Sequence, residues 1–571
     1  MSDPPSSQTS ASAFSMADRS SANSPKFHFG SQIPSFFCQE TGIHCSKHRP
    51  VVLPQDPFID LVSFVLSQPH RGVTALVDSA TGASLSYADL RRMVASFASG
   101  LSQIGVTANG VVLVLLPNII LFPVIFLAIL AAGAIFSSMN PLSKRDEVVK
   151  QMKQCRFTLI FTTAENAPNL TGLGVKIVIV PEEPDSSPSK FSHFYSLMSS
   201  RPTDAPRPVI RQTDAAAILF SSGTTGDVKG VVLTHRNLIA AVELFVGFEA
   251  SQCERESCKD VYLAAIPMFH IYGLSLFSMG ILSFGAAIVV MKKFDVAEAV
   301  RVIDAMKVTH FPVVPPILAS LARSEGTGGS RLETLVQVSC GAAPLNQKVM
   351  RDFLNAYPHV DLIQGYGLTE SSAVGTRGFN TINSKKHTSV GLLAPNMEAR
   401  VIDIETGFSL PPGSGGELLL RGPAIMKGYL NNENATLSTV VEDGWLKTGD
   451  IAYFDQDGFL FISDRLKETI KYKGFQIAPA DLEALLITHQ EVQDVAVTSA
   501  KNEEAGEIPV AFIVRSSGSK LSSSDIINFV AKKVAPYKKV REVVFVNSIP
   551  RSASGKVLRR KLRDSLAYSK L

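Results

Sequence analysis

Residues 111–136, VVLVLLPNIILFPVIFLAILAAGAIF, contain no charged side chain. An apolar stretch of this length is enough for one helix to cross a bilayer, so it separates membrane from globular proteins. Its internal order favours a globular protein. VVLVLL is typical of a strand, Asn118 is a candidate cap for a helix over residues 119–132, and Gly133 ends that helix. A strand–helix–strand unit buried on both faces has the same hydropathy as a membrane span, so we predict no span here.

Short apolar strands alternate with helical stretches through most of the first 400 residues, which indicates an α/β fold with helix-covered sheets. The clearest strands are TLIFTT, VKIVIV, AAAILFSS, AAIVVM and THFPVV. From about residue 398 the pattern changes to short strands and turns, as in EARVID and GELLLRG. After Asp464, the pattern predicts a compact α+β unit that includes a helix over 480–489.

The length of 571 residues exceeds what one hydrophobic core usually organises, so we expect several domains. We predict a disordered Ser/Pro-rich segment over residues 1–30. A large N-terminal domain follows over 31–464, with a β-rich subdomain from about 398 to 464, and a small α+β C-terminal domain occupies 465–571.

The charge of the chain is uneven, although its net charge is only +4. Residues 531–571 hold twelve lysines and arginines against two acids. Such a segment is compatible with nucleic acid, a membrane surface, an anionic ligand or simply a solvated helical face.

The six cysteines lack the spacing of a zinc site, so we expect reduced thiols without a disulfide framework or a metal cluster. The final residues Ser569-Lys570-Leu571 match the signal that the peroxisomal import receptor reads. We therefore expect a peroxisomal protein with that receptor as a partner.

Residues 221–230, SSGTTGDVKG, are typical of a loop that holds phosphate through backbone N–H groups, hydroxyls and a lysine. The usual nucleoside-triphosphate motif is not present: counted from Gly223, the required glycine falls on Val228, and Gly230 rather than Ser or Thr follows Lys229. This disfavours a P-loop kinase or GTPase. Taken alone, the loop is equally compatible with a flexible surface turn.

Further motifs follow the phosphate loop in a fixed order: QGYGLTE at 364–370, WLKTGD at 445–450, SDRLKE at 463–468, KYKGFQ at 471–476 and PRSASGK at 550–556. Together they resemble the acyl-adenylate-forming superfamily, and within it the plant 4-coumarate:CoA ligase-like branch with its peroxisomal jasmonate-precursor and cinnamate-type ligases. The resemblance implies ATP, Mg²⁺ and coenzyme A as cofactors. It also implies two half-reactions, in which a carboxylic acid first forms acyl-AMP and CoA then displaces AMP.

The resemblance further implies roles for individual residues. The phosphates of ATP would be held by Ser221, Ser222, Gly223, Thr224, Thr225, Gly226 and Lys229. The adenylate would be contacted by Gln364, Gly365 and Thr369, and the ribose hydroxyls by Asp450 assisted by Arg465. Glu370 would bind Mg²⁺, although an acid there could also serve only the N-terminus of a helix.

The resemblance implies catalytic roles for Lys556, His270 and Thr369. Without it, His270, which lies among aromatic residues, would be interpreted as an ordinary core residue. The acyl pocket would include Tyr272, Leu276, Gly341 and Ala342. Coenzyme A would contact Lys293, Lys473 and Gly474, and the mobile C-terminal domain would add the nucleotide contacts Lys467, Lys471 and Gln476. This domain is expected to rotate about Asp464-Arg465 between the half-reactions. The basic C-terminal segment would then face an anionic nucleotide within the same chain, which disfavours nucleic acid as a partner.

Two positions depart from the family pattern. Asp227-Val228 stands where the phosphate loop usually has a hydrophobic residue and a proline, and Leu276 replaces a small polar residue expected to face a phenol. The second change favours a more apolar acid, and cinnamate-like, fatty and oxylipin acids all remain open. The alternative functions are a luciferase-like adenylating oxygenase and a catalytically silent binding protein with an adenylation fold.

Overall fold

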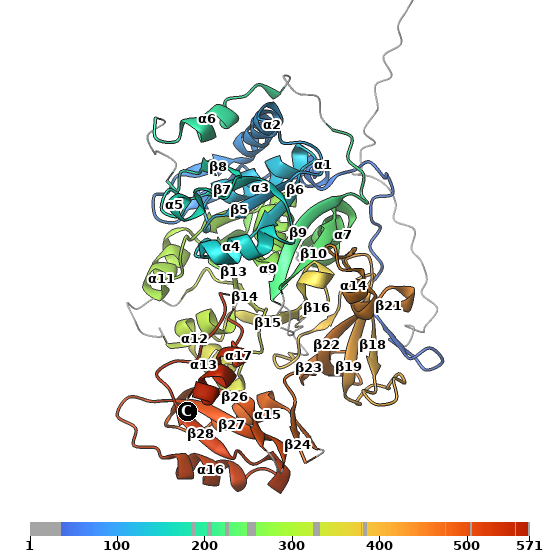
Figure 1. Cartoon of the computed structure of the whole chain (residues 1–571), viewed down its shortest axis with the longest axis vertical. Coiled ribbons are helices and arrows are strands. Elements are labelled where there is room, and N and C mark those ends of the chain that lie inside the picture. Colours follow the sequence, from blue (N-terminus) through green and yellow to red (C-terminus); the bar gives the residue numbers. More distant parts are fainter. Residues whose placement is uncertain are drawn as a thin grey trace, which may run out of the picture. The chain divides into compact units, whose positions relative to one another are not determined.

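The computed structural model describes residues 36–568 except 184–188, 203–207, 223–227, 248–258, 324–331, 379, 381–384, 474, 503–504 and 554. The predicted disordered segment 1–30 and the C-terminal Ser569-Lys570-Leu571 lie outside the described residues. Figure 1 labels the helices and strands in chain order.

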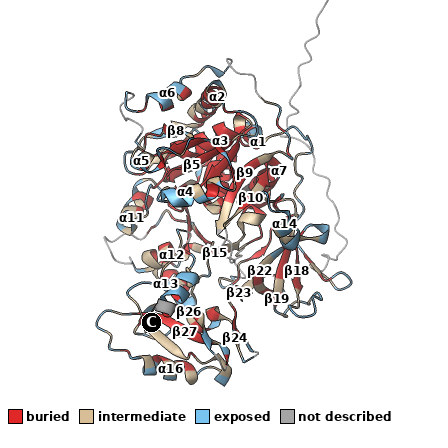
Figure 2. Cartoon of the chain, viewed as in Figure 1, coloured by how far each residue is buried: buried red, intermediate tan, exposed pale blue. Residues whose placement is uncertain are grey.

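The uncharged stretch 111–136 folds as predicted. It forms strand β5 (Val111–Leu115), helix α3 (Leu121–Ala131) and strand β6 (Ile135–Ser138), with β5 and β6 parallel neighbours. Gly133 leaves the helix with φ +73°, a conformation that favours glycine. Residues 121 to 130 are all buried, and Figure 2 shows α3 in the buried interior. In the described part of the chain, no helix is long and apolar enough to cross a membrane.

Asn118 does not cap α3, contrary to the sequence prediction. The helix begins after Ile120, without a side-chain cap. The buried amide of Asn118 instead donates to the carbonyl oxygens of Ala264 and Ile266 (2.9 Å to Ile266), and its Oδ1 accepts from the N–H of Met268 at 2.9 Å. A buried amide must find partners, and these lie on the segment that leads to His270.

The first sheet has the strand order β20-β10-β9-β6-β5-β7-β8 and is parallel from β9 to β8. Its other strands are β7 (Phe157–Thr162), β8 (Lys176–Ile179), β9 (Ala215–Ser222), β10 (Val228–Thr234) and β20 (Gly428–Tyr429). The β9–β10 and β10–β20 pairs are antiparallel.

The second sheet has the order β17-β16-β15-β14-β13-β11-β12-β3-β4 and is parallel from β15 to β3. Its strands are β3 (Thr74–Asp78), β4 (Ser84–Ser86), β11 (Val261–Ala264), β12 (Ala287–Val290), β13 (His310–Val313), β14 (Gln337–Cys340), β15 (Asp361–Tyr366), β16 (Thr376–Arg377) and β17 (Leu392–Leu393).

Helices and helical turns connect the strands of these two sheets. The helices are α1 (Leu61–Ser67), α2 (Tyr87–Gln103), α4 (Arg145–Met152), α5 (Ala167–Leu170), α6 (Ser192–Met198), α7 (His235–Ala241), α9 (Ile271–Ser275), α10 (Ile281–Ser283), α11 (Val296–Ala305), α12 (Pro315–Arg323) and α13 (Gln347–Ala356). The turns are η2 (Val242–Gly247), η4 (Leu276–Gly280) and η5 (Thr369–Ser371). One hydrophobic core runs through both sheets, and its parallel strands are covered by helices as the alternating sequence pattern predicts.

The third sheet is the predicted β-rich part. It joins β18 (Glu398–Ile402), β19 (Gly416–Arg421), β21 (Val440–Val441), β22 (Trp445–Phe454) and β23 (Leu460–Arg465) in antiparallel pairs. It also includes β1 (Phe37–Cys38) and β2 (Ile43–Cys45), a hairpin from the start of the chain that the sequence pattern did not indicate. Helix α14 (Glu433–Thr439) and the turn η6 (Glu442–Gly444) connect its strands.

His44 on β2 gives this sheet a testable dependence on pH. Its ring is fully buried and stacks on Phe454 with 4.3 Å between ring centroids. Burial lowers the pKa of His44 from 6.5 to about 4, and the backbone of Leu410 opposes this only in part. The unfolded chain therefore binds the proton more readily, so the stability that neutral His44 provides is present above pH 6.5 and is lost as the pH falls toward 4.

The substitution His44→Phe should reduce this acid sensitivity. Between pH 6.5 and 4, its free energy of unfolding should fall by about 3 kcal/mol less than that of the wild-type protein. Urea unfolding at several pH values measures this when it is followed by the fluorescence of Trp445 on β22 of the same sheet, with His193→Gln at an exposed position of α6 as the control. Identical pH profiles for His44→Phe and the wild-type protein would contradict the assignment.

The C-terminal sheet has the order β25-β24-β27-β26, with β28 parallel to β27. Its elements are β24 (Ile470–Tyr472), β25 (Phe475–Ile477), α15 (Pro479–Leu486), β26 (Val492–Asn502), β27 (Gly506–Arg515), α16 (Ser523–Ala531), the turn η7 (Pro536–Lys538), β28 (Glu542–Phe545) and α17 (Arg559–Tyr568). Two hydrophobic clusters of its own lie on the two faces of the sheet. The predicted combination of a large α/β domain and a small C-terminal domain is confirmed.

The basic C-terminal segment corrects one expectation, because several of its cations pair with acids of the same small domain. Lys538 pairs with Asp481 at 2.9 Å and Arg551 with Asp494 at 2.8 Å, and Arg559 contacts Glu468 and Glu483. The charges of these side chains are therefore balanced inside the domain. Lys556, in contrast, is close enough to the predicted ribose contact Asp450 and the predicted magnesium ligand Glu370 for their charges to act on it.

Candidate active site

The predicted site residues cluster where parallel strands end. The phosphate loop follows β9, His270 follows β11, Gly341 follows β14, and Glu370 follows β15. In open α/β sheets, ligands bind outside the carboxyl ends of the strands, because loops and backbone groups converge there. The topology therefore brings together residues that are far apart in sequence.

The phosphate-loop hairpin places Lys229 directly opposite Ser221 across the β9–β10 pair. Residues Gly223, Thr224, Thr225 and Gly226 lie outside the described residues, as does Asp227, and only the backbone of Ser222 is described. On the other side of β10, Tyr429 pairs with Val231. Side chains two residues apart on a strand share a face, so Ser221, Lys229 and Tyr429 lie on the same face of the sheet.

Glu370 meets this face from the turn η5. Its Oε1 accepts hydrogen bonds from the hydroxyl of Ser221 at 3.2 Å and from the hydroxyl of Tyr429 at 3.0 Å, and its carbonyl oxygen accepts from the N–H of Met426 at 2.8 Å. Thr369, its neighbour in the turn, is half-buried. Both hydroxyls thus hold the carboxylate of Glu370 by the same oxygen, Oε1.

This donor set fits a magnesium ion that is shared with ATP. Mg²⁺ usually takes one or two carboxylates together with substrate phosphates and keeps several waters. Among the described residues, no group of three His, Cys, Asp or Glu side chains could hold a metal by itself. A single oriented carboxylate beside a phosphate loop therefore fits the metal only together with the nucleotide.

The predicted ribose site is a compact group around Asp450, whose surface is only 2% exposed. Asp450 on β22 pairs with Arg465 on β23, and Arg465 Nε lies 3.0 Å from its Oδ1. The hydroxyl of Tyr366 donates to Oδ2 at 2.6 Å. Burial and then the charge of Asp450 raise the pKa of Tyr366, so its hydroxyl stays protonated and donates.

Lys556 lies among the charged groups of this site. Its pKa is lowered mainly by loss of hydration and then by Arg465, while Asp450 and Glu370 oppose that shift. The side chain of Lys556 is nevertheless exposed to solvent, so its environment is characterised by the neighbouring charges and not by burial. Gly555, with φ +79°, fits closely against Pro316: a side chain there would begin 3.0 Å from the Pro316 ring. The loop that carries Lys556 therefore lies against the start of α12.

His270 precedes α9, and its ring lies tilted at 41° against that of Phe269, with 4.7 Å between ring centroids. Burial, and secondarily the positive charge of Lys556, lowers its pKa to about 4. The imidazole is therefore neutral near pH 7 and lies close to Lys556. Two of the three predicted catalytic residues, one from the middle of the chain and one from its C-terminal domain, thus lie in one region.

The predicted acyl-pocket residues also lie together. A Cβ at Gly341 would stand 3.3 Å from the ring of Tyr272, so glycine allows the close approach of these segments. The hydroxyl of Tyr272 donates to the carbonyl oxygen of Ser339 at 3.2 Å, and Ala342 has φ +68°. Leu276 begins the π-helical turn η4, and only 2% of its surface is exposed.

Two predicted nucleotide residues are held by the sheet itself. The side-chain Nε2 of Gln364 donates to the carbonyl oxygen of His387 at 2.6 Å, and Gly365 pairs with Arg377 across β15 and β16. The amide of Gln364 is thus already engaged by the protein. Its predicted contact with the adenylate would involve the second amide N–H, the amide oxygen or the backbone.

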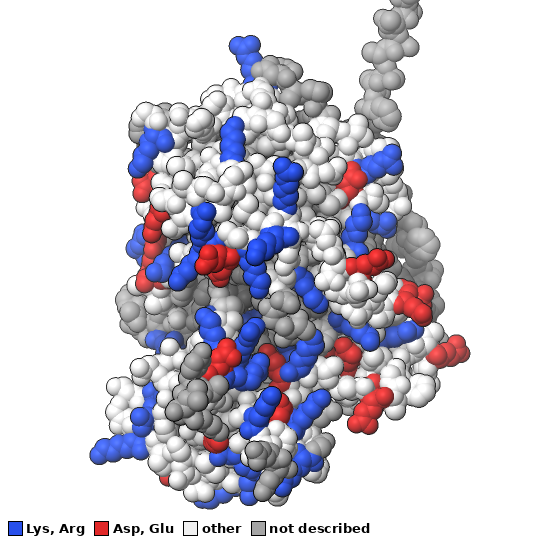
Figure 3. All heavy atoms as spheres, viewed as in Figure 1, with Lys and Arg blue, Asp and Glu red and all other residues white. Residues whose placement is uncertain are grey.

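The predicted CoA contacts and the further nucleotide contacts of the C-terminal domain lie at the protein surface or outside the described residues. Lys293, Lys467, Lys471 and Lys473 are all exposed, Gly474 lies outside the described residues, and only the backbone of Gln476 is described. Lys473 has φ +46° and donates its N–H to Ala505. Figure 3 shows that Lys and Arg side chains gather across the middle of the face in view.

Sequence reasoning missed two tyrosines that orient acidic side chains. Tyr366 lies inside the motif QGYGLTE but was given no role, and Tyr429 belongs to no motif that we used. Their hydroxyls bond to Asp450 and Glu370, acids that are far away in sequence. Sequence spacing alone carries no signal for either contact.

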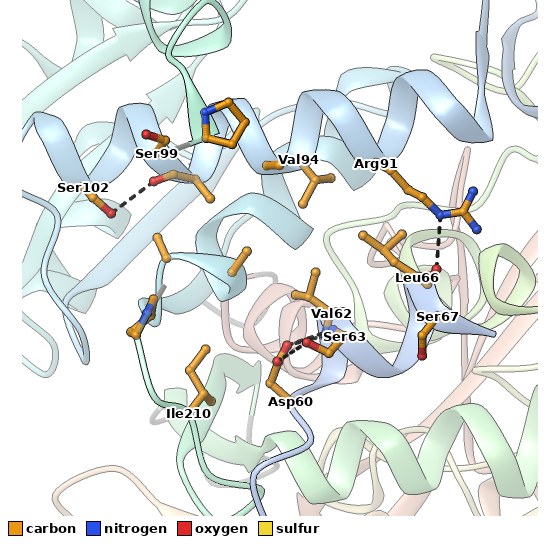
Figure 4. Close-up of a pocket in the computed structure, with 16 residues that line it drawn as sticks. Asp60, Val62, Ser63, Leu66, Ser67, Arg91, Val94, Ser99, Ser102 and Ile210 are labelled. Carbon is orange, nitrogen blue, oxygen red and sulfur yellow. Dashed lines mark hydrogen bonds between the residues drawn. The ribbon is translucent and has the colours of Figure 1, made fainter. Parts of the chain in front are cut away.

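A cavity of about 370 Å³ lies elsewhere, between α1, α2, the end of α3 and the segment around Ile210 (Figure 4). Val62, Leu66 and Val94 are among its apolar walls, and Arg91 donates to the carbonyl oxygen of Leu66 beside it. None of the predicted site residues lines it. We therefore do not assign this cavity to the reaction.

Comparison with known families identifies both parts of the chain. Residues 66–430 match the AMP-binding enzyme family, and residues 481–556 match the AMP-binding enzyme C-terminal domain. The structure of ATP-bound MatB from Rhodopseudomonas palustris has the same fold. Its sequence is 24% identical, and its TM-score is 0.80 over 89% of this chain and 98% of that one. The AMP complex of MenE, the O-succinylbenzoate coenzyme A synthetase of Bacillus subtilis, gives a TM-score of 0.75 over 88% and 98%.

Plant proteins are among the similar sequences. 4-Coumarate–CoA ligase-like 6 of Arabidopsis thaliana is 55% identical over 95% of this chain and 97% of its own length. Peroxisomal OPC-8:0-CoA ligase 1 of the same plant is 43% identical over 92% and 97%. The motifs, the fold and these similarities agree: the chain belongs to the acyl-adenylate-forming AMP-binding enzyme family, in its 4-coumarate–CoA ligase-like group.

Proposed function

We propose that this protein joins a carboxylic acid to coenzyme A in an ATP-dependent reaction that passes through acyl-AMP. The observation that carries the proposal is the convergence of Lys556, Glu370 and the Asp450–Arg465 pair at the carboxyl ends of the parallel strands. One site thus combines groups suited to a carboxylate, a polyphosphate and a ribose. The names of the relatives support the same reaction class.

The first half-reaction forms the mixed anhydride. A carboxylate oxygen of the acid attacks the α-phosphorus of ATP, the bond to the bridging oxygen breaks, and pyrophosphate leaves. Lys556 would stabilise the negative charge that develops between the carboxylate and the α-phosphate, and Lys229 would hold the departing phosphates. Asp450 would accept hydrogen bonds from the ribose, which fixes the nucleotide relative to the acid.

Glu370 is the residue that would hold Mg²⁺. When bound, the ion neutralises phosphate charge and favours departure of pyrophosphate. The carboxylate of Glu370 is already oriented by Ser221 and Tyr429, so the side chain loses little conformational freedom when the nucleotide binds.

The second half-reaction forms the thioester. The CoA sulfur attacks the carbonyl carbon of acyl-AMP, and AMP leaves with the bonding electrons. We propose that the C-terminal domain, residues 465–571, rotates about Asp464-Arg465, so that Lys556 leaves and Lys473 and Gly474 approach. Asp464 supports a hinge role because it is buried at the end of β23 and bonds to the N–H groups of both Arg465 and Ala480. Lys293, Lys467, Lys471 and Gln476 complete the proposed contacts with CoA and the nucleotide.

The alternatives predict different products. A luciferase-like oxygenase would consume oxygen after the adenylate forms, and a silent binding protein would release no pyrophosphate. The intact set of Glu370, Asp450, Arg465 and Lys556 favours an active ligase over a silent protein.

The acid itself is proposed to be an apolar one of cinnamate-like, fatty or oxylipin type, because Leu276 is fully apolar and lies on the turn that follows Tyr272. Pyrophosphate release and acyl-CoA formation should be measured with unsubstituted and hydroxylated cinnamates and with fatty acids of several lengths. The wild-type protein should prefer acids without a ring hydroxyl. Leu276→Ser should shift kcat/KM toward hydroxylated cinnamates by about 10- to 100-fold. Activity of the wild-type protein with hydroxylated cinnamates alone would contradict this substrate class.

A peroxisomal location is proposed from Ser569-Lys570-Leu571, with the import receptor as partner. A relative that is named peroxisomal, at 43% identity, supports this location.

A further inference from the structure

Tyr429 contacts both charged groups that the proposed function places at the ATP phosphates. Its hydroxyl donates to Oε1 of Glu370 at 3.0 Å. Its ring lies under the ammonium group of Lys229, with 4.8 Å between Nζ and the ring centroid. An ammonium group over an aromatic face is attracted by the ring quadrupole, so one side chain contacts the carboxylate and the lysine at once.

The protein holds Tyr429 in place through contacts that do not involve a ligand. The two-residue strand β20 pairs Tyr429 with Val231 on β10, and the N–H of Tyr429 donates to the hydroxyl of Thr436 at 2.9 Å. Lys229 is two residues before Val231 and lies on the same face, diagonally across from Tyr429. The sheet register therefore sets the spacing between Tyr429, Lys229 and Glu370.

Glu370 is oriented asymmetrically by its two hydroxyl donors. Ser221 and Tyr429 both donate to Oε1, at 3.2 and 3.0 Å. Saturating Oε1 in this way directs the carboxylate and leaves Oε2 to accept a cation. Hydrogen bonds to charged groups are stronger than those between neutral groups, so loss of one should alter the carboxylate measurably.

We propose that Tyr429 is a positioning residue that fixes Glu370 for the magnesium ion through its hydroxyl and Lys229 for the phosphates through its ring. This inference rests on the proposed function, in which Glu370 and Lys229 serve ATP. It adds that the two groups are coupled by a residue outside the phosphate loop. The hydroxyl and the ring make separate contributions, so substitutions can separate them.

Calorimetric titration with ATP, with and without Mg²⁺ and without any carboxylic acid, tests this without catalytic turnover. Tyr429→Phe removes the hydroxyl and keeps the ring. It should weaken binding of ATP with Mg²⁺ about tenfold and leave metal-free ATP binding within about twofold. Tyr429→Leu removes both contributions and should weaken both kinds of binding. The control Tyr453→Phe, at a tyrosine that stacks on Phe461 in the third sheet, should match the wild-type protein.

Ser221→Ala provides a second test, because it removes the other donor to the same oxygen. It should also weaken binding selectively in the presence of Mg²⁺, and the double variant with Tyr429→Phe should lose more than either single variant. Wild-type affinities in Tyr429→Phe, or an equal loss with and without Mg²⁺, would overturn the positioning role. If the wild-type protein bound ATP equally with and without Mg²⁺, the proposed function would fail, and the inference with it.

Discussion

Replacing Lys556 with alanine is expected to lower the rate of acyl-AMP formation by about 100- to 1,000-fold, because the developing charge would lose its cationic partner. Thioester formation from supplied acyl-AMP and CoA should proceed at close to the wild-type rate. The charges of Asp450 and Glu370 act on Lys556, and the charge of Lys556 acts on His270, at the proposed site of the first half-reaction. Rapid-quench measurement of each half-reaction tests whether Lys556 serves acyl-AMP formation alone.

Lys561→Ala is the matched control, since Lys561 is an exposed lysine on α17 of the same small domain. It should leave both half-reactions unchanged. Equal loss of both half-reactions in Lys556→Ala would contradict a role confined to adenylation. Normal adenylation in that variant would remove Lys556 from the mechanism.

Arg559→Leu is expected to destabilise the C-terminal domain by about 3–5 kcal/mol, because it would leave buried acids without their partner. Arg559 contacts Glu468 and lies 2.7 Å from Glu483, and all three side chains are largely buried. It also donates from Nε to the carbonyl oxygen of Val497 on β26. Burial raises the pKa of Glu483, and the charge of Arg559 opposes that rise.

Hydrogen exchange of β26 and β27 measures this effect locally, since a single unfolding transition need not describe a chain with two domains. Arg560→Leu, at the exposed neighbour on the same helix, should change exchange little. Adding Glu483→Gln to Arg559→Leu should recover part of the loss, because it removes one of the two stranded charges. Equal exchange in Arg559→Leu and Arg560→Leu would show that the buried ion pairs contribute little.

Local sequence patterns predicted the parts of the fold that depend on hydrophobic periodicity. The uncharged stretch became β5, α3 and β6, and the turn-rich region after residue 398 became an antiparallel sheet. The same patterns could not assign Asn118, because a capping amide and a buried bridging amide look alike in sequence. The segment whose backbone the Asn118 amide bridges, Ala264 to Met268, lies far from Asn118 along the chain.

The family resemblance placed the main charged groups, but the contacts between them are a product of strand order. Ser221 and Glu370 lie 149 residues apart, at the ends of strands β9 and β15 that belong to different sheets, and their side chains nevertheless meet. Tyr429 enters that site through a two-residue strand that no periodic pattern reveals. The internal pairing of Arg551 and Arg559 was missed for the same reason: their acidic partners lie 57 or more residues away.

The central claim is that this protein activates a carboxylic acid as acyl-AMP before CoA takes part. Exchange of labelled pyrophosphate into ATP, measured without CoA across the panel of acids, tests this most directly. We predict exchange that requires both Mg²⁺ and an apolar acid, followed, when CoA is added, by release of one AMP for each acyl-CoA formed. Formation of ADP and phosphate, or acyl-CoA synthesis without any exchange in the absence of CoA, would contradict the claim.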